Sequence, residues 1–252
     1  MATERHEIVA LSSTSAEDAV LRPVRGTNAF EDVVERILHA IKLGIVPFGE
    51  RLPPERELAS KLGVSRVTLR EAISALHESG YVESRRGRTG GTFVTYRPRA
   101  TPKRDTAVRR MVQSMGTSLD DALTFRAALE PGAAAAAAER ELTAEDREML
   151  RARLDESDAA SLAEYRQADS RLHLAIAQVT GSPSLAAAVA DVRMRLNDLL
   201  DAIPLLAANI EHSRRQHIAI VDAILDGRID RARREMQDHL DGTAALLRGF
   251  LG

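Results

Sequence analysis

The 252-residue sequence predicts a mainly α-helical protein, with an N-terminal winged helix-turn-helix that carries a small β-hairpin and a C-terminal all-α helical bundle. Residues 52–95 show the pattern of two short helices followed by a hairpin. After residue 117 the chain has long helical periodicity and no alternating strand pattern. Residues 51–110 hold 14 Lys and Arg against 6 Asp and Glu, whereas residues 111–252 hold 16 against 23. This charge split predicts a basic module for nucleic acid beside an acidic module with another task.

Composition excludes several classes of protein. The chain has no cysteine, which excludes disulfides and thiolate metal sites and fits a reducing cytoplasm. No apolar run approaches the roughly 18 residues of a membrane span, and the N-terminus lacks the apolar core of a signal peptide. We therefore expect a cytoplasmic protein with no membrane partner.

The N-terminal residues 1–27 mix Ser, Thr, Ala and charges without periodicity, which predicts a disordered arm. A DNA-binding domain is expected over residues 28–97, and its first helix should be capped by Thr27 or Asn28 and end at Gly44. Apolar residues recur at helical spacing along this first helix: Phe30, Val33, Val34, Ile37, Leu38 and Ile41.

Residues 52–79 predict a helix-turn-helix. Pro53 and Pro54 suit the start of a helix, because proline is tolerated only in its first turn. Gly63 is placed to end that helix, and Ser65 to cap a second one that reaches about Ser79. In such a unit the second helix enters the major groove of DNA.

The second helix should present a polar face near its start. Val67, Leu69, Ile73 and Leu76 are expected to pack inward, which leaves an outward set that suits guanine edges and phosphates: Ser65, Arg66, Thr68 and Arg70. Residues 81–84 and 92–95 read as strands joined by a glycine-rich tip with Arg85, Arg86 and Arg88. This tip predicts a wing that follows the DNA backbone or enters a minor groove.

In these residues the chain resembles the winged helix-turn-helix of the GntR family of bacterial transcription regulators. The resemblance rests on LPPERELASKLGVSRVTLREAISALHESGYVESRRGRTGGTFV, which holds the cap, the second helix and the wing in order. It implies double-stranded DNA as a partner and a set of DNA-contacting positions: Arg56, Ser65, Arg66, Thr68, Arg70 and Gly87. Arg86 and Arg88, beside Gly87 on the tip, extend this set.

The prolines and charges of residues 98–117 predict a linker, either a solvated hinge or a segment that adds phosphate attraction. Beyond it, residues 118–252 predict the all-α bundle. Pro131 should kink or restart the first bundle helix. The expected helices cover residues 118–140, 143–157, 161–180, 182–203, 210–226 and 228–250.

One acid and three histidines fall on apolar helix faces of this bundle. Asp169 and His173 are neighbours at i, i+4 within a stripe that includes Leu162, Tyr165 and Leu172, while His217 and His239 lie on the inward sides of the last two helices. A buried carboxylate needs a cation or a strong hydrogen bond. Bundle cores build metal sites from facing helices, although inward histidines are also found as satisfied core residues. Spacing alone leaves both interpretations open.

The segments DSRLHLAIAQVTGSPSL, HIAIVDAILDGRIDRARREMQDHL and FRAALEP resemble the ligand-binding (FCD) domain of the FadR-type branch of the same family. The resemblance implies that Asp169, His173, His217 and His239 hold a divalent metal ion, zinc or nickel foremost, with a small carboxylate completing the coordination. One departure is Ser182, where many relatives have Asn before the proline.

Arg126 is the candidate for binding that organic acid, because it shares a stripe with Leu119 and Leu123 and matches a frequent arginine of the family. A guanidinium binds a carboxylate through two parallel hydrogen bonds. The alternative is a pair with Glu130 at i, i+4.

These observations predict a DNA-binding transcription regulator, expected to be a homodimeric repressor on a near-palindromic operator, whose DNA affinity answers to a small organic acid at the metal site. Two alternatives remain. An Asp/His₃ metal with an open position suits a metal-dependent hydrolase, although no separate general base is evident. The second alternative is a regulator whose metal ion is only structural.

Overall fold

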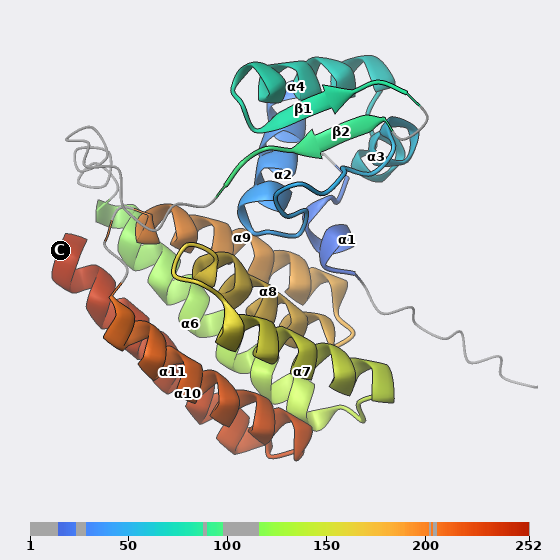
Figure 1. The fold of residues 1–252 in the computed structure, drawn as a ribbon. Coiled ribbons are helices and arrows are strands. Elements are labelled where there is room, and N and C mark those ends of the chain that lie inside the picture. The colour runs from blue at the N-terminus through green and yellow to red at the C-terminus, as the bar shows by residue number, and fades with distance from the viewer. Residues whose placement is uncertain are drawn as a thin grey trace, which may run out of the picture.

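The computed structural model describes residues 15–23, 29–87, 90–97, 116–201, 203 and 206–251. Figure 1 shows a small winged domain stacked on a larger helical bundle, with a short helix at their junction. The mainly α fold with a two-stranded sheet confirms the predicted fold class. No helix in the described ranges combines the length and the apolar character that crossing a membrane requires.

The winged domain follows the predicted element order. Its helices are α2 (Ala29–Lys42), α3 (Glu55–Leu62) and α4 (Arg66–Glu78). Gly63 ends α3 with φ of 67°, a left-handed conformation that glycine adopts without a Cβ penalty. Ser65 caps α4 by accepting a hydrogen bond from the Thr68 amide. Strands β1 (Val82–Arg85) and β2 (Gly91–Val94) pair antiparallel.

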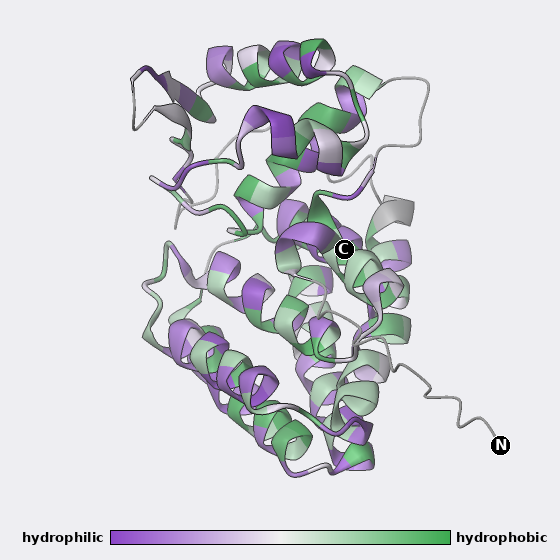
Figure 2. Cartoon of the chain, turned by 90° about the vertical axis from the view of Figure 1, so that its right-hand side faces the viewer, coloured by the Kyte–Doolittle hydropathy of each residue, from purple (hydrophilic) through white to green (hydrophobic). Residues whose placement is uncertain are grey.

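Six helices form the bundle: α6 (Gly116–Glu139), α7 (Ala144–Ala159), α8 (Tyr165–Gln178), α9 (Pro183–Leu200), α10 (Ala207–Leu225) and α11 (Ile229–Leu251). Thr143 and Asp146 form a reciprocal capping box at the start of α7, and Ser182 caps α9 despite its departure from the family pattern. Coloured by hydropathy, the bundle helices carry both hydrophilic and hydrophobic residues, as amphipathic helices around a shared core do (Figure 2).

Three predictions about helices are wrong. Helix α6 continues through Pro131 to Glu139, so the predicted restart at this proline is wrong. The carbonyl of Ala127, an exposed residue, does not receive the hydrogen bond that an amide at position 131 would donate. Helix α8 begins at Tyr165, so Leu162 lies before it and is 47% exposed. Val67 is 66% exposed, because the inward face of α4 is occupied by Leu69, Ala72, Ile73 and Leu76.

The predicted disordered arm, residues 1–27, contains a helix. Helix α1 (Ala16–Val20) is capped by Ser15, and Ala19, Val20 and Leu21 are each no more than 2% exposed. These three apolar residues were overlooked because a five-residue helix shows no periodicity; it is held by tertiary packing. The candidate caps Thr27 and Asn28, the first residues of the arm and the linker up to residue 115 lie outside the described residues.

The loop after α2 turns at Gly44, where the winged domain touches the bundle. Gly44 has φ of 70°, and a Cβ there would lie 2.1 Å from Arg171 Nη1 and 3.0 Å from Gln167 Cβ. Gln167 and Arg171, both on α8, donate hydrogen bonds to the carbonyls of Ile41 and Gly44 at 3.0 and 3.1 Å. Glycine therefore permits both the turn and the close approach.

We expect Gly44→Ala to lower the free energy of unfolding by about 1–3 kcal/mol, because it forces a left-handed residue with a side chain against α8. Urea denaturation followed by circular dichroism measures this change. Gly249→Ala is the matched control: its Cβ meets nothing within 4 Å in an exposed helical turn, so stability should hold or rise slightly. Equal effects of the two substitutions would contradict the close approach at Gly44.

Candidate metal centre and nucleic-acid interface

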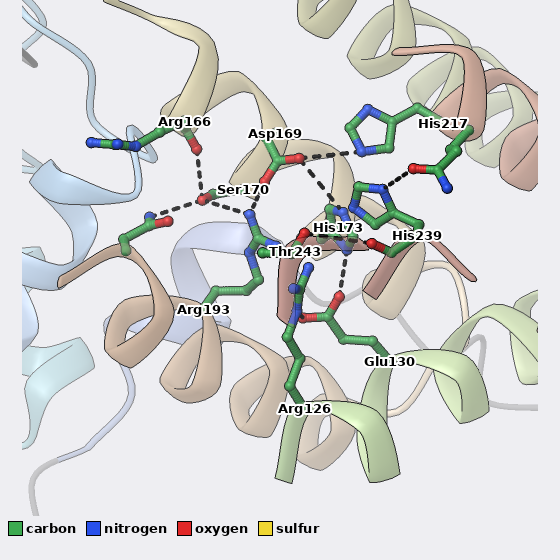
Figure 3. A network of polar contacts seen from close by, with 12 residues as sticks. Arg126, Glu130, Arg166, Asp169, Ser170, His173, Arg193, His217, His239 and Thr243 are labelled. Atoms are coloured by element: carbon green, nitrogen blue, oxygen red, sulfur yellow. Dashed lines mark hydrogen bonds and ion pairs between the residues drawn. The ribbon is translucent and has the colours of Figure 1, made fainter. Parts of the chain in front are cut away.

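The four predicted ligands meet in the core of the bundle. Helix α8 supplies Asp169 and His173 from successive turns, α10 supplies His217, and α11 supplies His239 (Figure 3). One ligand atom of each residue lies within 4.8 Å of those of the other three. All four side chains belong to residues that are at most 8% exposed. The structure thus brings together the whole set that the sequence singled out.

Their donor atoms converge on one point. His217 Nε2 lies 3.2 Å from Asp169 Oδ1, and His173 Nε2 lies 3.7 Å from the same oxygen. Among the described residues, none of the Nε2 atoms of His173, His217 and His239 has a hydrogen-bond partner of acceptable geometry. Buried polar atoms are normally satisfied, so three convergent unpaired nitrogens beside a carboxylate fit a divalent cation.

The electrostatics supply the protonation states that ligands need. Burial alone would raise the pKa of Asp169, but Arg193 and the neighbouring histidines outweigh it and hold that pKa well below its usual value. Burial lowers the pKa of His173 to about 4, although Glu130 opposes the shift, and it lowers the pKa of His239 well below its usual value. At neutral pH the carboxylate is charged and both imidazoles are neutral, as metal binding requires.

Three supporting residues orient the ligands. Glu130 Oε2 lies 2.5 Å from His173 Nδ1, and Gln216 Oε1 lies 3.2 Å from His239 Nδ1. Arg193 forms an ion pair with Asp169 Oδ2. Partners at Nδ1 fix the ring so that Nε2 faces the metal position. The sequence indicates Glu130 only as a partner for Arg126. For Gln216 and Arg193, the sequence pattern does not show which side of the helix each residue occupies.

Arg126 forms the predicted ion pair and keeps one donor without a partner among the described residues. Its Nε donates to Glu130 Oε1 at 3.0 Å, and both side chains are 2% exposed, so the predicted i, i+4 pair exists. Its Nη1 has no hydrogen-bond partner among the described residues. Arg126 also lines a cavity of about 120 Å³, together with Asp169, Arg193 and His239. One edge of the guanidinium is held by Glu130, and a donor remains for a ligand.

This cavity is lined by both polar and apolar side chains. The polar ones include Asp169, His239, Tyr165 and Arg166, and the apolar ones include Leu196, Leu200, Ile203, Ile210 and Leu246. A site of this composition suits a small organic anion with a short hydrocarbon part.

The nucleic-acid candidates gather on the winged domain. Arg56, Arg66 and Arg70 are exposed, whereas Thr68 is half-buried and its hydroxyl lies 2.9 Å from Ser65 Oγ in the cap. Arg70 Nε donates to Glu55 Oε2 at 2.7 Å, so α3 pre-orients this side chain. The exposed Val67 adds an apolar surface next to Arg66, of the kind that contacts thymine methyl groups. The sequence pattern places Val67 on the inward face of this helix, so it gives no sign of this exposed apolar surface.

The wing presents fewer free arginines than its sequence suggested. Arg86 and Gly87 are exposed beyond β1. Arg85 lies within β1, where its Nε donates to Glu83 at 2.7 Å and its guanidinium stacks over Phe93 at 4.3 Å. Arg88 lies outside the described residues.

Comparison with known sequences and structures places the chain. The profile described as "Bacterial regulatory proteins, gntR family" matches residues 29–94, and the FCD domain matches residues 121–242. The chain is 32% identical over 232 residues to the putative HTH-type transcriptional regulator RmpR of Mycobacterium gastri, which covers 90% of this chain and 83% of that protein.

The chain belongs to the GntR family of bacterial transcription regulators.

Other GntR relatives support the same class. The putative L-lactate dehydrogenase operon regulatory protein of Escherichia coli (strain K12) is 34% identical over 242 residues, covering 87% of this chain and 86% of that protein. The solved structure of E. coli McbR/YncC has a TM-score of 0.52 at 19% identity, covering 90% of this chain and 100% of that one, which shows a shared fold alone. The chain is therefore a transcription regulator with an FCD domain rather than a metal-dependent hydrolase.

We expect Gln216→Ala to weaken zinc binding by about tenfold or more, because His239 loses the partner that orients its ring. Isothermal titration of the metal-free protein with zinc measures the affinity. Gln237→Ala, which removes a surface hydrogen bond to Asp241 on the same helix as His239, should leave zinc affinity unchanged. Equal zinc affinity in Gln216→Ala and wild type would contradict the role of Gln216.

Proposed function

We propose that this GntR regulator is a FadR-type homodimeric repressor that loses operator affinity when a small carboxylate binds beside a divalent metal ion. The metal ligands are Asp169, His173, His217 and His239, and Arg126 binds the carboxylate. One observation carries the proposal: Asp169 and His239 of the four-residue cluster line the same cavity as Arg126, whose Nη1 has no hydrogen-bond partner among the described residues. The protein acts on DNA, in the bacterial cytoplasm.

The donor set favours zinc or nickel over harder cations. Three imidazoles and one carboxylate suit borderline transition metals, whereas magnesium and calcium prefer oxygen ligands. Four protein donors on one side leave room for a further ligand from the cavity, because Asp169 and His239 line its wall.

Charge explains why the further ligand is an anion. In the core, Arg126 and Arg193 are balanced by Glu130 and Asp169, and all four are buried. A divalent metal therefore leaves the centre with an excess of two positive charges in a medium of low dielectric. A carboxylate that reaches both the metal and Arg126 neutralises part of this excess.

The dimer follows from DNA geometry. One helix-turn-helix covers a half-site, so a two-fold operator requires two copies of the chain. Relatives include the HTH-type transcriptional repressor NanR of Cronobacter sakazakii, 31% identical over 256 residues, covering 92% of each chain, and the Glc operon transcriptional activator of E. coli (strain K12), 29% identical over 220. Repression is proposed here; a reporter behind the operator that falls silent on deletion of the gene would overturn it.

A purely structural metal is the second candidate, because the four ligands tie α8, α10 and α11 together. In that case the metal stabilises the bundle and the carboxylate does not contact it.

Arg66→Ala combined with Arg70→Ala should lower affinity for specific DNA by about 100-fold or more, since each arginine supplies base or phosphate contacts near the helix start. The probe is the duplex that the wild-type protein enriches from a random-sequence pool, followed by fluorescence anisotropy across a salt series. Arg151→Ala with Arg233→Ala, two exposed bundle arginines, is the control and should bind like wild type. If the Arg66/Arg70 variant binds the duplex as tightly as wild type does, these two arginines are not part of the DNA interface.

Zinc-loaded protein should bind a small carboxylate at least about tenfold more tightly than the metal-free protein, because the metal and Arg126 share the anion. Thermal shifts against L-lactate, glycolate and citrate, with and without chelator, measure this. His217→Ala should abolish the increase in carboxylate affinity that zinc causes. Chelation that lowers Tm but leaves carboxylate affinity intact selects the structural metal.

A further inference from the structure

The segment of residues 15–23 lies outside both matched ranges, residues 29–94 and 121–242. It holds α1 and sits at the junction between the winged domain and the bundle (Figure 1). Among helix pairs of the described residues, extensive packing between the two domains runs through α1, which packs on α9 and α8 below and on α2 above. Direct contacts between α2 and the bundle include the ion pairs of Arg36 with Asp191 and of Lys42 with Asp198.

Apolar burial holds the segment in place. Ala19, Val20 and Leu21 are 1–2% exposed and belong to one continuous core cluster. That cluster includes Val33 and Ile37 of α2, Leu58 and Leu62 of α3, and Val189 and Met194 of α9. The two domains thus share a core to which residues 15–23 contribute.

Ion pairs attach the segment to both sides. Lys61 of α3 donates to Glu17 at 2.8 Å and to Asp18 at 3.2 Å. At the other end Arg22 pairs with Asp191 of α9, which also accepts from Arg36 of α2 at 3.2 Å. One short segment is therefore bonded to the first helix of the helix-turn-helix and to the bundle.

The bundle helices under the segment also carry the metal centre. Asp191 lies two residues before Arg193, which pairs with the ligand Asp169. On α8, Gln167 and Arg171 bond the carbonyls of Ile41 and Gly44, while Asp169, which lies between them, and His173, two residues beyond Arg171, belong to the metal cluster. The residues of α8 and α9 that contact the metal cluster therefore lie within about one helical turn of residues that contact the junction.

We propose that residues 15–23 form a clamp, the α1 clamp, that fixes the winged domain in one orientation on the bundle. With the clamp closed, each winged domain keeps a set position relative to the metal centre. When its ion pairs are broken, both domains stay folded and the winged domain samples a wider range of orientations on the bundle, although Gln167 and Arg171 still contact the loop after α2. If the protein is the dimeric DNA-binding regulator proposed above, on which this step rests, the clamp also sets the spacing of DNA half-sites that the dimer accepts.

The test uses the full chain, whose lack of cysteine permits clean spin labelling. Labels at Glu78→Cys on α4 and Ala152→Cys on α7, both exposed, report the placement of the two domains by electron–electron double resonance. An excess of unlabelled protein keeps one labelled chain per dimer. Wild type should give a single narrow distance.

Arg22→Glu with Lys61→Glu breaks the pairs at both ends but leaves Ala19, Val20 and Leu21 in place, so helical content by circular dichroism should persist. The distance distribution should then broaden about twofold or split. Adding Glu17→Lys and Asp18→Lys re-forms the pairs at α3 with exchanged charges and should narrow it again. Leu21→Ala, which weakens the apolar anchor, is a second route to release.

Arg228→Glu with Arg233→Glu is the control, since both arginines lie on the exposed far side of the bundle chain, away from the clamp residues. It should keep the wild-type distribution. If the clamp variants fold and keep the narrow wild-type distance, the proposal is overturned. It is equally overturned if the control broadens the distribution as much as they do.

A DNA measurement separates the clamp from the proposed function. On duplexes whose half-sites are moved by one or two base pairs, wild type should prefer one spacing by about tenfold, and the clamp variant should lose most of that preference. If wild type enriches no duplex, the proposed function fails while the distance measurement still decides the clamp. Equal spacing preference in both proteins overturns the link from clamp to spacing.

Discussion

The ionised carboxylate of Asp169 inside the helical bundle is the constraint on which the rest of the structure depends. A charge buried to this degree is stable only with compensating partners. The residues around Asp169 come from four helices: His173 from α8, the helix of Asp169 itself, Arg193 from α9, His217 from α10 and His239 from α11. Their meeting fixes the rotation of each helix about its axis. A second buried pair, Arg126 with Glu130 on α6, completes the wall. Stability and ligand chemistry therefore rest on the same side chains.

Glu130 has an unusual position between these two roles. One oxygen accepts from Arg126 and the other faces His173 Nδ1. The Arg126 guanidinium and the His173 ring are thus oriented by a single carboxylate, whose pKa Arg126 and His173 hold low although burial opposes them. Glu130 thus joins the candidate effector residue to a candidate metal ligand.

The junction of the domains is a packed contact as well as a covalent connection. Charge and proline content predict a linker over residues 98–117 and give no sign of packing between the winged domain and the bundle. The structure instead seats α1 between them and bonds α8 to the loop at Gly44. Packed contacts therefore run from α8, which carries Asp169, to the winged domain.

The sequence by itself determined the features with a local cause. The cap at Ser65, the glycine end of α3, the helical stripes and the i, i+4 pair of Arg126 with Glu130 depend on residues close together in the chain, where periodicity and capping rules apply. The Asp169, His173, His217 and His239 set also stood out, because polar residues inside apolar stripes are visible one helix at a time.

Tertiary structure decided the remainder. The pairing of Asp169 with Arg193, 24 positions away, the supporting contact of Gln216, the outward turn of Val67 and the burial of α1 depend on how whole helices meet. Such contacts are set by the packing of distant segments, for which a local pattern carries no signal.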